Sequence, residues 1–105
     1  MQYCSVYITT GSEDEALRIS RLLVEEKLAA CSNIFPVKSV YRWLGQIEEG
    51  GEAAMFLKTR CDLVDAIIKR VKELHSYEVP CIVSTPIDKG NPDYLDWIKE
   101  STLES

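Results

Sequence analysis

The order of two hydrophobic periods along the chain constrains the fold more than any other sequence feature. Residues 3–10 alternate between two faces and are rich in β-branched and aromatic side chains, which is typical of a strand. A helical period follows and runs to about Leu28, after the capping pair formed by Ser12 and Glu15. The chain therefore opens with a strand and a helix that can pack on it.

A long hairpin is predicted next. Residues 29–44 and 47–60 have strand character on either side of a turn at Gly45-Gln46. Pro36 cannot donate to a sheet ladder, so we expect a bend, a bulge or a sheet edge at that point. Gly50-Gly51 interrupts the returning strand and favours a bulge or kink there.

The remaining sequence repeats the alternation of helix and strand. Asp62 and Asp65 are predicted to cap a helix whose apolar residues recur at intervals of three and four between Val64 and Leu74. Residues 81–87 form a short apolar strand, and a last helix begins at Asn91-Pro92. The resulting order is β-α-β-β-α-β with an extra C-terminal helix.

This order predicts an α+β, ferredoxin-like fold, in which two helices cover one face of an antiparallel sheet. Its 105 residues suffice for a single domain over 1–105. Aromatic residues also lie on the other face, such as Tyr3, Tyr7, Tyr41 and Trp43, and an uncovered apolar face promotes association. Together with the free edges of the long hairpin, they lead us to infer a homo-oligomer. The alternative is that the terminal helix alone covers this face.

The composition excludes several classes of partner. The net charge is −5, so an acidic surface argues against nucleic acid and against anionic membranes. The longer uncharged stretches, residues 1–12 and 28–37, are too short to span a bilayer, and the N-terminus has no export signal. We therefore expect a cytoplasmic protein. The four cysteines form no C-x-x-C pair, and we interpret each as a small buried hydrophobic residue rather than part of a disulfide or metal cluster.

Several segments together resemble the CutA (divalent-cation-tolerance) proteins. The resemblance spans nearly the whole chain, in order and at the right spacings. It is carried by residues 26–34 (EKLAACSNI), by 39–45 (SVYRWLG), by Lys58-Thr59, by 75–80 (HSYEVP), and by Gly90, Tyr94, Leu95 and Trp97. The resemblance implies a tight homotrimer with an architecture similar to that of the PII signalling proteins. It also implies a cytoplasmic role linked to copper and other divalent cations, with no catalysed reaction and no catalytic residue.

The same resemblance identifies the candidate metal ligands. Copper-binding members are described with a cysteine at the end of the first strand and two adjacent histidines after the second helix. This chain has Thr9 and Leu74 at two of those positions, so only His75 matches. Cys81 stands where the family usually has glutamate and is a candidate substitute ligand for copper or another divalent cation, although a buried strand cysteine is the other interpretation.

Two further groups of residues are candidates for an interface or a ligand cleft. Cys31 and Lys58 form the first, because a lysine beside a thiol makes it more nucleophilic. We expect Lys58 to pair with Glu48, Glu52 or a backbone carbonyl at a subunit contact. The second is a cleft for a small anionic or metal-bound ligand, bordered by Lys58, His75 and the aromatic residues Tyr41, Trp43, Tyr77 and Trp97. A PII-like trimer that senses a small ligand without binding metal is therefore the alternative function.

Overall fold

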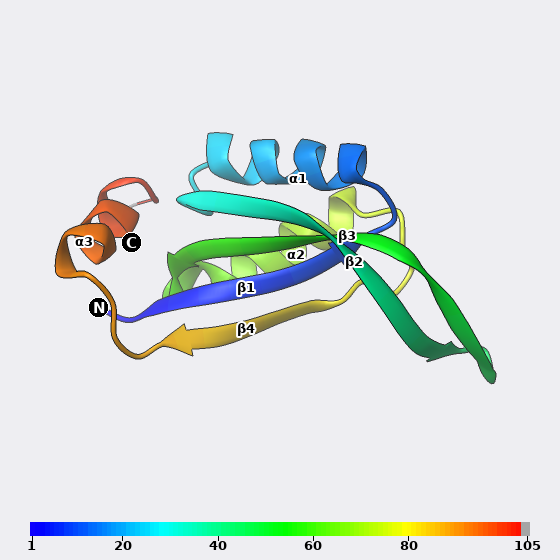
Figure 1. Cartoon of the computed structure of the whole chain (residues 1–105). Helices are drawn as coiled ribbons and strands as arrows, with labels where there is room; N and C mark the ends of the chain where they lie inside the picture. Colours follow the sequence, from blue (N-terminus) through cyan, green and yellow to red (C-terminus); the bar gives the residue numbers. More distant parts are fainter. Residues whose placement is uncertain (104–105) are drawn as a thin grey trace.

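The computed structural model describes residues 1–103 and shows the predicted order of elements (Figure 1). The strands are β1 (Tyr3–Thr10), β2 (Cys31–Trp43), β3 (Gln46–Arg60) and β4 (Ile82–Ile87). The helices are α1 (Glu13–Glu25), α2 (Val64–Leu74) and α3 (Pro92–Glu100), with a short 3-10 helix, η1 (Cys61–Leu63), before α2. All strand pairs are antiparallel in the order β2-β3-β1-β4, which confirms the ferredoxin-like prediction.

The main core lies between the sheet and the two helices α1 and α2. The alternation in β1 places Val6 and Ile8 on this face, opposite Leu57 and Met55 of β3. The apolar stripes of both helices close over them, with Ile19 from α1 among the fully buried side chains. Large-to-small substitutions at such positions typically cost about 2–5 kcal/mol of stability.

The first helix ends earlier than its pattern predicts. Lys27 has a positive φ of 60°, so the chain leaves the helix there, and the N–H of Leu28 bonds the carbonyl of Leu23. No glycine marks this left-handed position, and the apolar residues up to Leu28 continue the stripe although they lie outside the helix. Ser12 caps the start as predicted, since its hydroxyl accepts from the N–H of Glu15 at 3.1 Å.

The start of the second helix differs from the prediction. Neither Asp62 nor Asp65 caps it, because η1 comes first and Leu63 occupies the N-cap without a side-chain hydrogen bond. Asp62 instead binds the guanidinium of Arg60 through both carboxylate oxygens, at 3.0 Å each. At α3 the prediction is confirmed, with Asn91 as the cap and Pro92 in the first turn.

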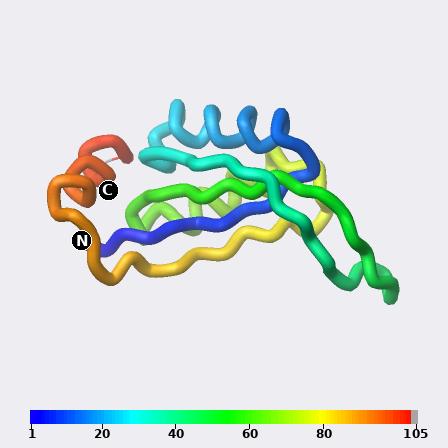
Figure 2. Tube along the Cα trace, in the orientation of Figure 1, coloured from blue at the N-terminus to red at the C-terminus, as the bar shows by residue number. Residues whose placement is uncertain are grey.

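The hairpin of β2 and β3 extends well beyond the rest of the sheet (Figure 2). Its turn is at Leu44-Gly45, one position earlier than predicted, and both residues have positive φ. Pairing is continuous past Gly50 and Gly51, so the expected bulge is absent there. Pro36 lies in β2, an edge strand, where a residue without an N–H is tolerated, as predicted.

Helix α3 and both described ends of the chain lie at the end of the molecule opposite the hairpin tip (Figure 1). The helix packs Ile98 against Tyr3, with Ile87 beside them, and so covers one end of the second sheet face. It leaves the rest uncovered, for Val83 and Phe56 on that face remain exposed. The helix alone therefore does not cover the open face. No helix within residues 1–103 is long and apolar enough to cross a membrane.

Candidate functional site

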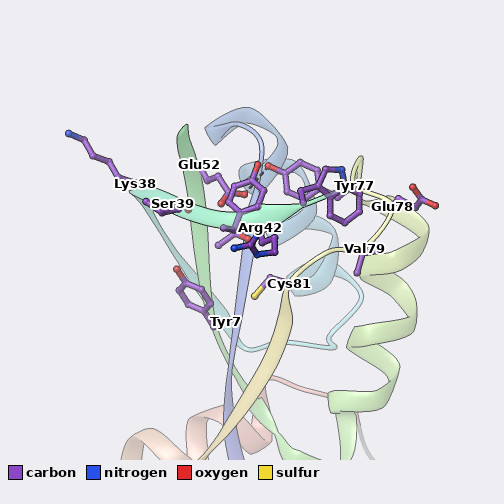
Figure 3. Close-up of a pocket in the computed structure, with 13 residues that line it drawn as sticks. Tyr7, Lys38, Ser39, Arg42, Glu52, Tyr77, Glu78, Val79 and Cys81 are labelled. Atoms are coloured by element: carbon purple, nitrogen blue, oxygen red, sulfur yellow. Dashed lines mark hydrogen bonds between the residues drawn. The ribbon is translucent and has the colours of Figure 1, made fainter. Parts of the chain in front are cut away.

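A cavity of about 850 Å³ opens beneath the hairpin, where it curves over the start of β4 (Figure 3). Three predicted aromatic residues border it, namely Tyr41 and Trp43 of β2 and Tyr77 of the loop after α2. Cys81 lies at the same cavity, just before β4, and is exposed rather than buried in the strand as one interpretation held. Open aromatic walls of this size suit a planar or amphipathic group.

Several cavity residues were not expected from the sequence. They are Tyr7 of β1, Arg42 of β2, Glu52 of β3 and Glu78 of the loop before β4. Figure 3 shows Arg42 directed toward the hollow, whereas Lys38 points away from it. The alternation of β1 already placed Tyr7 on the open face, but only the curvature of the hairpin brings Arg42 and Glu52 to the same place.

Tyr77 connects the loop after α2 to the hairpin. Its hydroxyl donates to a carboxylate oxygen of Glu52 at 2.8 Å. Burial, followed by this hydrogen bond to a carboxylate, raises the pKa of Tyr77 to about 12, so the phenol stays protonated. The ring also lies beside Gly11, 3.5 Å from where a Cβ would stand, which is an ordinary packing distance.

His75 lies beside the cavity and does not border it. Its side chain is fully buried, its Nε2 is 2.7 Å from the carbonyl oxygen of Thr9, and its Nδ1 accepts from the N–H of Tyr77 at 3.0 Å. With Nδ1 as an acceptor, Nε2 is the ring nitrogen that donates to the carbonyl of Thr9. The positions of Thr9 and His75 thus adjoin, as the resemblance requires, but both ring nitrogens are occupied by the protein itself.

A divalent cation does not fit this donor set in a single chain. Leu74 packs against the core, and Thr9 meets His75 through its carbonyl group. Nowhere along residues 1–103 do three or more histidine, cysteine, aspartate or glutamate side chains gather as ligands. A closed protein site for a transition metal needs three or four such donors.

Glu15 ties the first helix to the loop after α2. The Oε2 atom of Glu15 accepts from the N–H of Ser76 at 2.8 Å. The Oε1 atom accepts from the hydroxyl of Ser76 and from the N–H of Gly11. Burial raises the pKa of this carboxyl, but the hydrogen bonds from Ser76, then that from Gly11, outweigh it and hold the pKa below the ordinary 4.5.

The lowered pKa of Glu15 predicts a loss of stability in acid. A carboxyl whose pKa is lower when folded stabilises the protein above its unfolded pKa, and this contribution is lost as the pH falls through the folded value. We expect Glu15→Gln to lower the free energy of unfolding by about 1–2 kcal/mol at pH 7. Below about pH 4.5 the difference from wild type should shrink. Thermal melts across this range measure it, with Glu13→Gln in the same exposed helical turn as the control. A difference that stays constant with pH would contradict the assignment.

Cys31 and Lys58 lie opposite each other on β2 and β3, at the far end of the sheet from the cavity. Lys58 binds the side-chain oxygen of Asn33 at 2.6 Å and lies over the ring of Phe56, 5.1 Å from its centroid. Within residues 1–103 Lys58 pairs with neither Glu48 nor Glu52, because Asn33 is nearer along the neighbouring strand. The pairing with a backbone carbonyl at a subunit contact stays a prediction.

The thiol of Cys31 contacts α3 instead of forming a reactive pair with lysine. Its Sγ lies 3.3 Å from the hydroxyl of Tyr94, and this hydrogen bond, together with burial, raises the pKa of Tyr94 to about 12. Trp97 packs against Tyr94 in a tilted arrangement, with 5.4 Å between the ring centroids. The predicted cleft thus divides in two. Tyr41, Trp43 and Tyr77 share the cavity, whereas Trp97, Lys58 and His75 do not border it.

Comparisons with known proteins cover almost the entire chain. A sequence model of the CutA1 divalent ion tolerance protein matches residues 4–101. The divalent-cation tolerance protein CutA of Archaeoglobus fulgidus is 49% identical over 96 residues, which cover 91% of this chain and 94% of that protein.

Solved structures agree with the match. The structure described as the periplasmic divalent cation tolerance protein CutA from Archaeoglobus fulgidus has a TM-score of 0.93 at 47% identity, covering 94% of this chain and 97% of that one. The crystal structure of CutA1 from Oryza sativa has a TM-score of 0.96 at 40% identity, covering 100% and 97% of the two chains. This chain belongs to the CutA1 divalent ion tolerance family.

Proposed function

We propose that the chain serves divalent-cation tolerance as a homotrimer, in which copper or another divalent cation binds weakly at donors near the subunit contacts. The observation that carries this proposal is the uncovered apolar surface of the sheet and hairpin. Residues 40–51 are all exposed in the single chain, and they include Val40, Leu44 and Ile47 at 69%, 84% and 65% exposure. A two-stranded ribbon with such residues is not stable alone in water and needs a neighbour.

The location of the cation follows from which donors are available. The imidazole of His75 is already hydrogen-bonded at both nitrogens, so it is a poor ligand unless the fold around it opens. The thiol of Cys81 is exposed at the cavity and is a soft donor for copper or zinc. One thiol binds a cation weakly, and donors from a neighbouring copy would be needed to complete a site.

Calorimetric titration tests the cation part of the proposal. We expect Cu²⁺ and Zn²⁺ to give weak, saturable heats with the wild-type protein, and Cys81→Ser to weaken them. Cys31→Ser is the matched control, because it removes the other free thiol at the far end of the sheet. Unchanged isotherms for Cys81→Ser would contradict the role of that thiol, and no heat from either metal would contradict cation binding. Saturable heat from a nucleotide, without a response to metal, would favour the ligand-sensing alternative.

A further inference from the structure

The cysteine pair Cys4 and Cys61 forms a disulfide that joins β1 to η1. The two Cα atoms are 5.0 Å apart across a sequence separation of 57 residues. Cys4 is buried, whereas Cys61 is partly exposed. Neither residue borders the cavity, and neither belongs to the motifs that carry the family resemblance. The bond therefore has a role outside the site described above.

The residues next to the two cysteines hold the C-terminal segment in place. Arg60, which precedes Cys61, is 3% exposed at its side chain and binds both carboxylate oxygens of Asp62. The same guanidinium donates to the carbonyl of Leu103, whose N–H donates to the carbonyl of Lys27 at 2.9 Å. We call Arg60, Asp62 and Leu103 the C-terminal clasp. It anchors the chain just after α3.

On the other side of the bond, Tyr3 forms the surface on which α3 rests. Tyr3 precedes Cys4 and packs with Ile98 in a small buried cluster. The disulfide thus joins the two supports of α3, the Tyr3 surface and the C-terminal clasp, into one rigid unit. Without the bond, the two supports stay joined by the pairing of Tyr3 with Arg60 at the end of the β1–β3 ladder and by the hydrogen bond from the N–H of Cys61 to the carbonyl of Gln2, at 2.9 Å. The end of a ladder opens more readily than its middle.

We propose that Cys4–Cys61 is a redox site, and that its reduction by a dithiol loosens the C-terminal clasp and releases α3 from the sheet. One thiolate of the dithiol attacks Sγ of Cys61, the less buried cysteine, and Cys4 leaves as a thiolate that takes up a proton. The second thiolate of the dithiol then attacks the mixed disulfide and frees Cys61, which is also protonated. Two electrons pass to the protein, and the dithiol becomes a disulfide.

The consequence is a change in the surface that the protein presents. With α3 in place, Tyr3, Ile87 and the thiol of Cys31 are covered or contacted by the helix. Once α3 is released, this end of the open face becomes accessible, and Cys31 loses its contact with Tyr94. The redox state of one bond thus controls how much of the apolar face is available.

Hydrogen exchange followed by mass spectrometry tests the proposal on the full chain, oxidised and treated with dithiothreitol. We expect amides in residues 92–103 to exchange about tenfold faster after reduction, because the opening is local. Low urea should leave this acceleration unchanged, since a local opening exposes little surface. Tyr94→Phe is the matched control: it removes the contact with Cys31 but keeps the bond, so it should retain the redox response.

Three outcomes would overturn the proposal. Equal exchange of residues 92–103 in both redox states would show that the bond does not control α3. An acceleration that rises with urea in parallel with that of α1 would show that the bond affects only global stability. Four free thiols in the folded, air-oxidised protein would show that the bond does not form. In the variant that carries both Cys4→Ser and Cys61→Ser, residues 92–103 should exchange fast with and without dithiothreitol. If this variant does not fold, the comparison of oxidised and reduced wild-type protein alone decides.

Discussion

The variant with both Cys4→Ser and Cys61→Ser should melt about 20 °C below the oxidised wild type at the same protein concentration. The bond closes a loop with a sequence separation of 57 residues, and in the chain-entropy description such a loop stabilises the fold by roughly 4 kcal/mol. Because the bond joins the first strand to the turn after the third, most of the sheet lies within the loop. Calorimetry or circular dichroism under non-reducing conditions measures the shift.

The control for this experiment is the pair of substitutions Cys31→Ser and Cys81→Ser. These thiols form no bond, so we expect the control to melt within a few degrees of the wild type. Adding dithiothreitol should lower the melting temperature of the wild type and of the control, and leave the variant without Cys4 and Cys61 unchanged. Equal melting temperatures for that variant and the wild type would disprove the stabilising role of the bond.

Trp43→Asp should convert the proposed trimer into folded single chains. In the single chain Trp43 is 40% exposed, so the substitution costs little there, because the aspartate stays in contact with water. In the proposed trimer the same carboxylate would be buried without a partner, at a cost of roughly 3–5 kcal/mol for each copy. Light scattering coupled to size exclusion reports the mass, and circular dichroism reports whether the chain stays folded.

Lys69→Asp is a suitable control, since Lys69 is exposed on α2 in the layer opposite the open face. It changes the charge in the same direction and should leave the mass unchanged. If Trp43→Asp kept the wild-type mass and melting temperature, the hairpin would lie outside the interface. An unfolded Trp43→Asp chain would indicate instead that the hairpin is needed for folding of the single chain.

The sequence predicted the layers of the fold well, because both hydrophobic periods are strong. The strand pattern of residues 3–10 and the helical stripe of residues 64–74 specified which sides face the core, and both predictions are confirmed. Element ends were less accurate. Leu28 fits the apolar stripe of α1, yet the helix stops where Lys27 takes a left-handed conformation that no glycine signals.

The interpretation of Cys4 and Cys61 as unpaired residues was wrong for a different physical reason. Cys4 pairs with Thr59 in the ladder, which brings the turn that follows β3 to the beginning of β1. This closeness depends on the register of two strands far apart in sequence, and register depends on the exact turn. Spacing along the chain carried no signal for it. Disulfides are uncommon in cytoplasmic proteins, so the cytoplasmic location stays a prediction.

The candidate site was only partly predictable. Three aromatic residues came together as expected, namely Tyr41, Trp43 and Tyr77. The alternation of β2 places Tyr41 and Trp43 on one face, and the hairpin curves toward the loop that carries Tyr77. The hydrogen bonds that occupy His75 were not predictable, since they involve the backbone of Thr9 across the molecule. The capping role of Glu15 was predictable from the neighbouring sequence. Its contact with Ser76 joins residues 61 positions apart, so it could be identified only from the folded structure.

The mass of the wild-type protein in dilute solution tests the central claim most directly. If the exposed ribbon and the open face of the sheet are covered by other copies, sedimentation velocity at low micromolar concentration should show one species. Its mass should be that of three 11.9-kDa chains, about 36 kDa. A single folded species of 11.9 kDa at that concentration would contradict the account.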